Sequence, residues 1–252
     1  MTRRPSHLIV PDCHAHPSYS NSRFTALGKL IADIRPDKII CLGDFADMPA
    51  FCTHDAVVEG KRYKKDFEAV IDAQERLFNP IVKATGYKPH LHMCYGNHEE
   101  PRILKVLAEN PRLEGVIGLE SLRYKDFGWQ CHPFLEPHVE DGIAYAHYFA
   151  GGVAGRPISG DNIAKTLCNK LHTSAVQGHS HLLDRAIRPN ALGHTIFGLS
   201  AGWFGNPEMV EGWNRSTHAM WWAGVILLED VKDGFFKGYR EITQEKILRD
   251  YH

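Results

Sequence analysis

The feature that most constrains this chain is an alternation, near its N-terminus, of short apolar runs with longer segments of helical periodicity. The apolar runs predict buried strands at residues 7–11, 37–44 and 90–95. Helical periodicity covers residues 22–34 and about 64–84, and Pro101 marks the start of a further helix. Three strand–helix units in succession favour a mainly parallel sheet with helices packed over it.

The second half of the chain has a pattern richer in hairpins. Asp141-Gly142 and Asp233-Gly234 lie between strand-like runs and are typical of hairpin turns. Between them we expect a helix at about 161–171 and a strand at 174–177, and residues 223–242 predict a long antiparallel hairpin. Because no break in composition separates the halves, we expect one domain over residues 1–252.

Composition excludes several classes of protein. The 29 Lys and Arg residues are balanced by 30 Asp and Glu residues, so the chain lacks the basic excess of a general nucleic-acid clamp. The apolar run in its first segment is shorter than we expect for a signal peptide, no stretch of 18 apolar residues is present, and its six cysteines form no CxxC pair. We therefore expect reduced thiols, no membrane partner and a cytoplasmic location.

Polar residues follow the ends of the predicted strands in five clusters: Asp12-Cys13-His14, Gly43-Asp44, Gly96-Asn97-His98-Glu99, Ala146-His147-Tyr148 and Gly178-His179-Ser180-His181. In an open α/β sheet, ligands bind outside the carboxyl ends of the strands, so these clusters are expected to converge. Carboxylate, amide and imidazole donors without a thiolate suit Mn, Fe, Zn or Ni, and the set is large enough for two ions.

This ordered series resembles the signature of the calcineurin-like metallophosphoesterases, which runs D-x-H, GD, GNH[DE], H and GHxH. Every block is present between residues 12 and 181, whereas the motifs do not identify the chain from about residue 182 onward. The resemblance implies an α/β fold, a four-layer α/β/β/α sandwich of two mixed sheets flanked by helices. It also implies a two-metal phosphoester hydrolase.

The resemblance further implies a ligand set. One divalent ion would be held by Asp12, His14 and His181, a second by Asn97, His147 and His179, and Asp44 would bridge them. A hydroxide between the ions would attack phosphorus in line with the leaving oxygen. We favour manganese, with iron, zinc or nickel as alternatives, because such ligands accept several ions.

Other residues are expected to act on the substrate. By resemblance, His98 would contact the phosphate and protonate the leaving group, beside Asn97 and the bridging Asp44. Arg156, in the loop GGVAGRPISG, is a candidate phosphate contact because arginine grips phosphate through two parallel hydrogen bonds. Asp47 would orient a ligand, or it is a plain loop carboxylate.

The branch of the family decides the expected substrate. The run after Gly43-Asp44 lacks the arginine of the GDxVDRG pattern found in serine/threonine protein phosphatases. This departure favours a phosphodiesterase acting on a nucleotide or short nucleic acid, with a phosphomonoesterase or protein phosphatase as the alternative. A catalytically silent binding module is the alternative from another class, although no ligand is missing. The sequence does not decide whether the protein forms a homo-oligomer.

Three features stand outside the signature. The H-x-H pattern of His14-Ala15-His16 is typical of the first strand in metal-dependent amidohydrolases and related barrel phosphoesterases. Those barrels need eight strand–helix units, and the predicted hairpins argue against that number. If the chain is not such a barrel, we expect His16 to touch substrate or face solvent. The cluster Lys61, Arg62, Lys64 and Lys65 could steer a polyanion or simply be a solvated helix entrance. The aromatic residues of 203–222 could form core, stack on a base or make a dimer contact.

Overall fold

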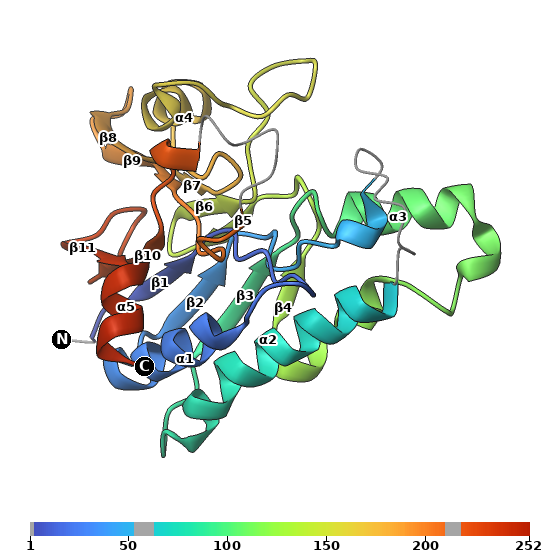
Figure 1. The fold of residues 1–252 in the computed structure, drawn as a ribbon. Helices are drawn as coiled ribbons and strands as arrows, with labels where there is room; N and C mark the ends of the chain where they lie inside the picture. The colour runs from blue at the N-terminus through green and yellow to red at the C-terminus, as the bar shows by residue number, and fades with distance from the viewer. Residues whose placement is uncertain (1–2, 53–62, 210–217) are drawn as a thin grey trace.

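The computed structural model describes residues 3–52, 63–209 and 218–252, and two β-sheets lie face to face in it with helices outside them (Figure 1). The first sheet has the order β11-β10-β1-β2-β3-β4. Its strands are β1 (His7–Val10), β2 (Lys38–Cys41), β3 (His90–Cys94), β4 (Gln130–His132), β10 (Gly224–Glu229) and β11 (Gly238–Thr243). β1 to β4 are mutually parallel, whereas β10 pairs antiparallel with β1 and β11 pairs antiparallel with β10.

The second sheet has the order β5-β6-β7-β9-β8. Its strands are β5 (His138–Glu140), β6 (Ile143–Ala146), β7 (Ser174–Gln177), β8 (Leu183–Pro189) and β9 (Thr195–Ala201). β6, β7 and β9 run parallel, and β5 and β8 pair antiparallel at the two edges. These two mixed sheets confirm the expected sandwich and contradict the barrel alternative raised by His14-Ala15-His16.

Helices cover the outer faces of both sheets. In Figure 1, α1 (Ser22–Ile34), α2 (Tyr63–Lys83) and α5 (Gln244–Asp250) lie against the first sheet, and α4 (Ile163–Leu171) lies against the second. α3 (Glu100–Glu109) follows β3. Short 3-10 turns are η1 (Pro49–Phe51), η2 (Pro111–Leu113), η3 (Leu119–Leu122), η4 (Tyr124–Phe127) and η5 (His218–Met220).

The side chains of the central strands point alternately to the helices and to the other sheet, which explains how the layers pack. On β1, Leu8 faces the helices while Ile9 faces the other sheet, and on β2 Ile39 and Ile40 divide in the same way. Successive side chains of a strand point to opposite faces, so a strand buried on both sides is apolar throughout. The interior between the sheets is completed by residues of the second sheet, including Tyr145.

The predicted elements agree closely with those observed. The helix expected over 22–34 and the strand expected over 174–177 have those bounds, and the terminal hairpin is β10 with β11. Asp141-Gly142 joins β5 to β6, and Asp233-Gly234 lies within the connection between β10 and β11. β4 and the β8–β9 hairpin were not predicted. Within the described ranges, no helix is both long and apolar enough to cross a bilayer.

Candidate metal centre

The predicted site residues meet where backbone hydrogen bonds connect the loop after β1 to the loop after β2. The carbonyl of Asp44 accepts the backbone N–H groups of Cys13, at 3.0 Å, and of His14, at 2.8 Å. The backbone N–H of His98 donates to Asp44 Oδ1 at 2.8 Å, which adds the loop after β3. The backbone N–H of His179 donates to Asp12 Oδ2 at 2.9 Å, which adds the loop after β7. Parallel strands thus deliver their carboxyl ends to one place.

One group of donors is formed by Asp12, His14 and His181, all of which are buried. Nε2 of His14 lies 3.2 Å from Nε2 of His181, and that nitrogen lies 3.2 Å from Asp12 Oδ2. Imidazole and carboxylate atoms separated in this way lie as neighbouring ligands of one ion do, since metal–nitrogen bonds are about 2.0–2.1 Å long. This is the first ligand set that the resemblance implies.

A second group adjoins it, formed by Asp44, His147 and His179. Nε2 of His147 lies 3.3 Å from Asp44 Oδ2 and 3.2 Å from His179 Nδ1. Asn97 Oδ1 lies 2.8 Å from the same His147 nitrogen, so the amide joins this group. Asp44 therefore belongs to the second group, and its backbone carbonyl, which accepts the N–H groups of Cys13 and His14, ties it to the loop that carries the first.

Hydrogen bonds fix which nitrogen of two histidines is free to bind a metal. Nδ1 of His147 donates to the carbonyl of Leu42 at 3.0 Å, and Nδ1 of His14 donates to Asp47 Oδ1 at 2.8 Å. Each Nε2 is therefore the nitrogen that faces the site and can ligate a metal ion. Asp47 is thus placed to orient His14, which is the first of the two expectations for it.

The backbone is unusual at the residues that carry the donors. His14, Asp44, His179 and His181 have φ values of 48°, 45°, 65° and 60°. Left-handed backbone is uncommon for residues other than glycine and concentrates at functional sites, where the surrounding structure enforces it. Here the surrounding hydrogen bonds turn each side chain toward the shared centre.

Two motif glycines let carboxylates and backbone approach closely. A Cβ atom at Gly96 would lie 2.0 Å from Asp44 Oδ1, and one at Gly178 would lie 2.1 Å from Asp12 Oδ1. Neither distance leaves room for a methyl group. The glycines of the GNHE and GHSH blocks are therefore explained by steric contact with the two metal-site aspartates.

The electrostatics of the centre fit two divalent ions. Burial alone would raise the pKa of Asp44, but the adjacent His147 and His98 outweigh it and hold that pKa well below its usual range. Burial lowers the pKa of His147, yet the two aspartates outweigh it and raise the pKa to about 9, so a metal ion that binds Nε2 has to displace a proton. Burial and the neighbouring His147 lower the pKa of His179 to about 4, so its ring is neutral. Buried carboxylates beside imidazole lone pairs attract positive charge, which divalent cations supply.

His98 lies beside these groups rather than within the two ligand sets above. Its Nδ1 donates to the Asp47 carbonyl at 3.0 Å and lies 3.1 Å from Asp47 Oδ1. Its Nε2 lies 3.8 Å from Asp44 Oδ2 and accepts from Arg102 Nη2 at 3.1 Å. His14, Asp47 and His98 also form a donor group of their own. The ring is therefore held by contacts on both nitrogens.

Several residues that shape the centre were given no role in the sequence analysis, although Glu99 belongs to the GNH[DE] block. Arg102 lies in the first turn of α3, four residues after His98. Glu99 accepts the N–H groups of Gly96 and Ala46 and the hydroxyl of Tyr124, which joins the loops after β2 and β3. The buried Arg23 donates to the carbonyls of Cys13, His14, Ser20 and Phe204. No sequence signal distinguishes Arg23 from a surface arginine.

The Trp-rich segment contributes a wall of the site. The indole of Trp203 stacks on His181, with centroids 5.6 Å apart, and Trp221 meets the same ring edge-on at 4.1 Å. Phe204 lies in the core beneath the helices, and Trp222 packs against the core between the sheets. Trp213 lies outside the described residues, so its predicted role is untested.

Three further candidates have a less direct relation to the centre. His16 Nε2 lies 3.8 Å from Asp47 Oδ2, so this ring lies near the site rather than in a ligand group. Arg156 has an exposed side chain in the loop between β6 and α4, and its role as a phosphate contact stays a prediction. Of the basic cluster, Lys64 and Lys65 lie in α2, whereas Lys61 and Arg62 lie outside the described residues.

Comparison with known proteins agrees with this geometry. The family model for calcineurin-like phosphoesterases matches residues 7–217, and the chain belongs to that family. Membership implies metal-dependent hydrolysis of phosphoesters, and the family generally uses a binuclear divalent metal centre. A search of curated proteins found no match.

Proposed function

We propose that this protein is a manganese-dependent phosphodiesterase that acts on a nucleotide or a short nucleic acid. The observation that carries the proposal is the pair of adjoining donor groups, Asp12–His14–His181 and Asp44–His147–His179, with His98 beside them. Two bound divalent ions would supply a hydroxide nucleophile near neutral pH and neutralise charge on the phosphoryl oxygens.

The chain's own residues would handle the leaving group. A diester releases an alkoxide, which is a poor leaving group unless it is protonated, and His98 is the imidazole available beside the ligands. Burial lowers the pKa of His98, but the charges of Asp44 and Asp47 outweigh that effect and raise it above its ordinary value. A raised pKa favours the protonated ring, which is the form that a general acid requires.

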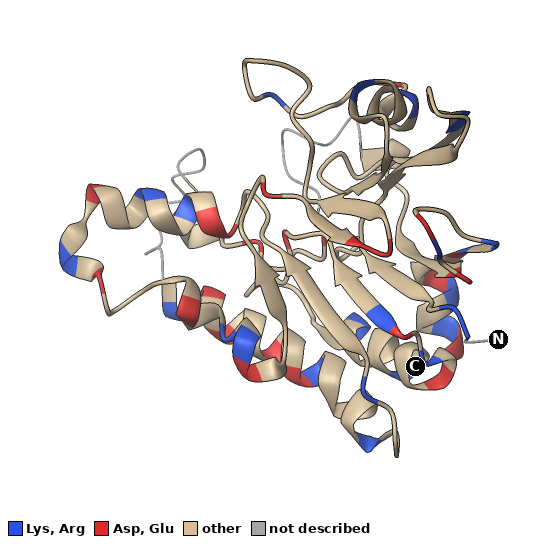
Figure 2. Ribbon diagram, turned by 180° about the vertical axis from the view of Figure 1, so that it is seen from behind, with Lys and Arg blue, Asp and Glu red and all other residues tan. Residues whose placement is uncertain are grey.

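The surroundings of the centre support a diester over a phosphoprotein. The buried Met48 occupies the position that arginine has in the GDxVDRG pattern of protein phosphatases. The charge pattern supports a small substrate, because Figure 2 shows Lys and Arg interspersed with Asp and Glu along the helices rather than gathered in one stripe. A long polyanion is usually bound through such a stripe.

The test is parallel hydrolysis of bis-p-nitrophenyl phosphate and p-nitrophenyl phosphate, with the metal-stripped enzyme reloaded with Mn, Zn, Fe or Ni. We expect a higher kcat/KM for the diester, greatest with Mn, and loss of activity in Asp44→Asn. Cyclic nucleotides and short single strands of DNA and RNA then narrow the substrate class. Preference for the monoester would instead support the phosphomonoesterase alternative, and no hydrolysis with any metal would support the silent binding module.

A further inference from the structure

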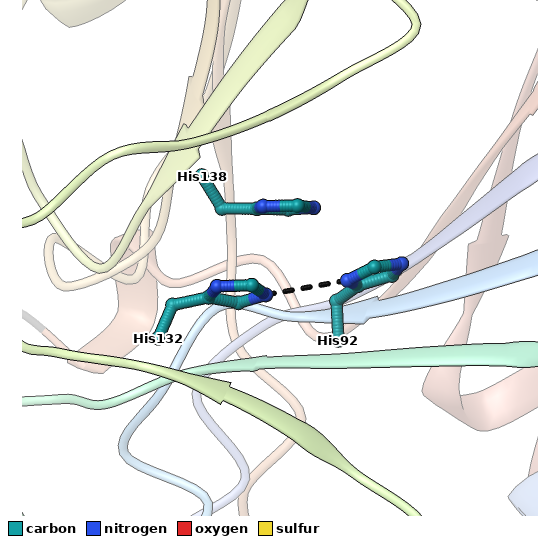
Figure 3. Close-up of side chains that lie close together, drawn as sticks. All are labelled: His92, His132 and His138. Carbon is teal, nitrogen blue, oxygen red and sulfur yellow. Dashed lines mark hydrogen bonds between the residues drawn. The ribbon is translucent and has the colours of Figure 1, made fainter.

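A separate group of imidazoles joins the two sheets. His92 lies on β3, His132 on β4 and His138 on β5, and one ligand atom from each lies within 4.8 Å of the others. β4 and β5 are terminal strands of their respective sheets. The group, hereafter the edge histidine cluster, shares no residue with the metal centre (Figure 3).

The three rings are nearly parallel and tightly packed. The centroids of His132 and His138 are 3.8 Å apart with planes at 15°, and those of His92 and His138 are 4.4 Å apart at 20°. His92 Nδ1 lies 3.2 Å from His132 Nε2, as the dashed line in Figure 3 marks, with His138 above. That separation is close to the edge of a tetrahedral zinc site, about 3.3 Å for zinc–nitrogen bonds of about 2.0–2.1 Å.

A carboxylate completes the donor set. Glu140 Oε2 lies 3.1 Å from His138 Nε2 and 3.8 Å from His92 Nε2. Its other oxygen, Oε1, pairs with Lys38, which also contacts Asp141. Lys38 therefore fixes the Glu140 carboxylate with one oxygen facing the rings, as a ligand or as the partner that orients a ligating histidine.

The three rings have lowered pKa values, so they can bind a cation as neutral ligands. Burial first, and then the neighbouring His138, lower the pKa of His92 to about 4, and the same two effects lower that of His132 to about 4. Burial also lowers the pKa of His138. All three rings are therefore neutral at pH 7, so a metal ion would not have to displace protons from them.

We propose that the edge histidine cluster, with Glu140, is a structural zinc site that ties the edge strand of one sheet to the edge strand of the other. Three imidazoles and one carboxylate form a donor set that suits zinc. His132 and His138 are only partly buried, which gives the ion access.

One adjustment accompanies binding. A metal ion lies in the plane of the imidazole that ligates it, so two stacked rings cannot both point at the same ion. We expect the ring of His138 to turn about its Cβ–Cγ bond, a torsion whose preferences are broad. The pair His92–His132 already has its nitrogens facing each other and needs little change.

The test counts zinc in matched proteins. The wild type, the double variant His132→Phe/His138→Phe and the control His194→Phe are stripped of metal and dialysed against zinc at neutral pH, and bound zinc is measured by mass spectrometry. Phe keeps the ring stacking, and His194 is an exposed histidine in the turn between β8 and β9. We expect the double variant to bind one zinc ion fewer than the wild type and the control, while Mn-dependent activity is retained.

A second measurement does not depend on the variants folding. Zinc added to the wild type, with its active centre already loaded with Mn, should shift the imidazole NMR signals of His132 and His138. It should also raise Tm by roughly 5–10 °C at zinc far above its dissociation constant. Equal zinc content in the wild type and the folded double variant would overturn the proposal, as would unchanged imidazole signals in the wild type.

Discussion

Arg102 Nη2 lies 3.1 Å from His98 Nε2, and Nη1 of the same guanidinium donates to the Asp47 carbonyl at 2.7 Å. That carbonyl also accepts from His98 Nδ1 at 3.0 Å. Arg102 and Asp47 therefore hold both nitrogens of the proposed acid. Because Arg102 donates to Nε2, His98 can carry a proton there only when the guanidinium moves to another acceptor, such as a substrate phosphate.

Arg102→Gln should separate this positioning role from a structural one. The positive charge of Arg102 lowers the pKa of His98, so its removal should shift the high-pH limb of the kcat profile to higher pH, because the acid then keeps its proton longer. Loss of a charge-assisted hydrogen bond should also reduce kcat/KM by roughly 10–100-fold. The exposed Arg112→Gln is the control, and an unchanged pH profile in Arg102→Gln contradicts the assignment.

His98→Ala tests the role of the imidazole itself. Removing a general acid should lower kcat by roughly 10²–10⁴-fold while both metal ions stay bound. Activity assays and metal analysis of the same preparation provide the measurement. If the variant loses metal, His98 is a ligand and the proposed role is wrong.

Asp47→Ala should weaken metal binding without removing a proposed ligand. Its carboxylate accepts from His14 Nδ1 at 2.8 Å and thereby directs Nε2 into the site. Loss of such an orienting partner typically reduces metal affinity by about 10–100-fold. Titration with Mn should show this decrease in Asp47→Ala and not in the exposed Asp161→Ala.

Gly28→Ala tests the packing of α1 on α2. In an exposed helix this change is stabilising by about 1 kcal/mol, but a Cβ at Gly28 would lie 2.2 Å from the carbonyl oxygen of Leu77. The helices must then separate, and we expect the free energy of unfolding to fall by about 1–3 kcal/mol. Gly152→Ala, where the added Cβ meets no atom within 4 Å, should change it little in the same urea titration.

The edge histidine cluster should make the folded protein sensitive to acid. The pKa values of His92 and His132 are lowered to about 4 in the folded chain, against about 6.5 when unfolded. Between these values the unfolded chain binds more protons, so the free energy of unfolding falls as pH falls from about 6.5 to about 4.

Chelator-treated protein unfolded in urea at pH 7 and pH 5 provides the measurement. His132→Phe should show a smaller loss of stability between the two pH values than the wild type, because one of the titrating rings is gone. His194→Phe should behave like the wild type. Equal losses in all three proteins would mean that the cluster does not contribute to acid sensitivity.

Most of the central fold could be predicted because local patterns determine it. The buried strands β1 and β2 are apolar runs with helices beside them, and α1 has one apolar face. β4 was missed because it has three residues, and β8 because its sequence LDRAIRP is half polar at an edge of the sheet. Pairing with a neighbouring strand, rather than local propensity, makes these segments extended.

The sequence by itself determined the candidate ligands, because polar residues at the carboxyl ends of parallel strands must meet at one edge. Asp12 and Asp44 follow parallel strands of the first sheet and are predicted by that rule, whereas His147 follows β6 of the second sheet and was indicated by its place in the ordered series of motifs. Only the tertiary structure decided that Arg102 contacts His98 and that the edge histidine cluster forms. These contacts depend on how helices and sheets pack, and the cluster draws on both sheets, so no local pattern encodes them.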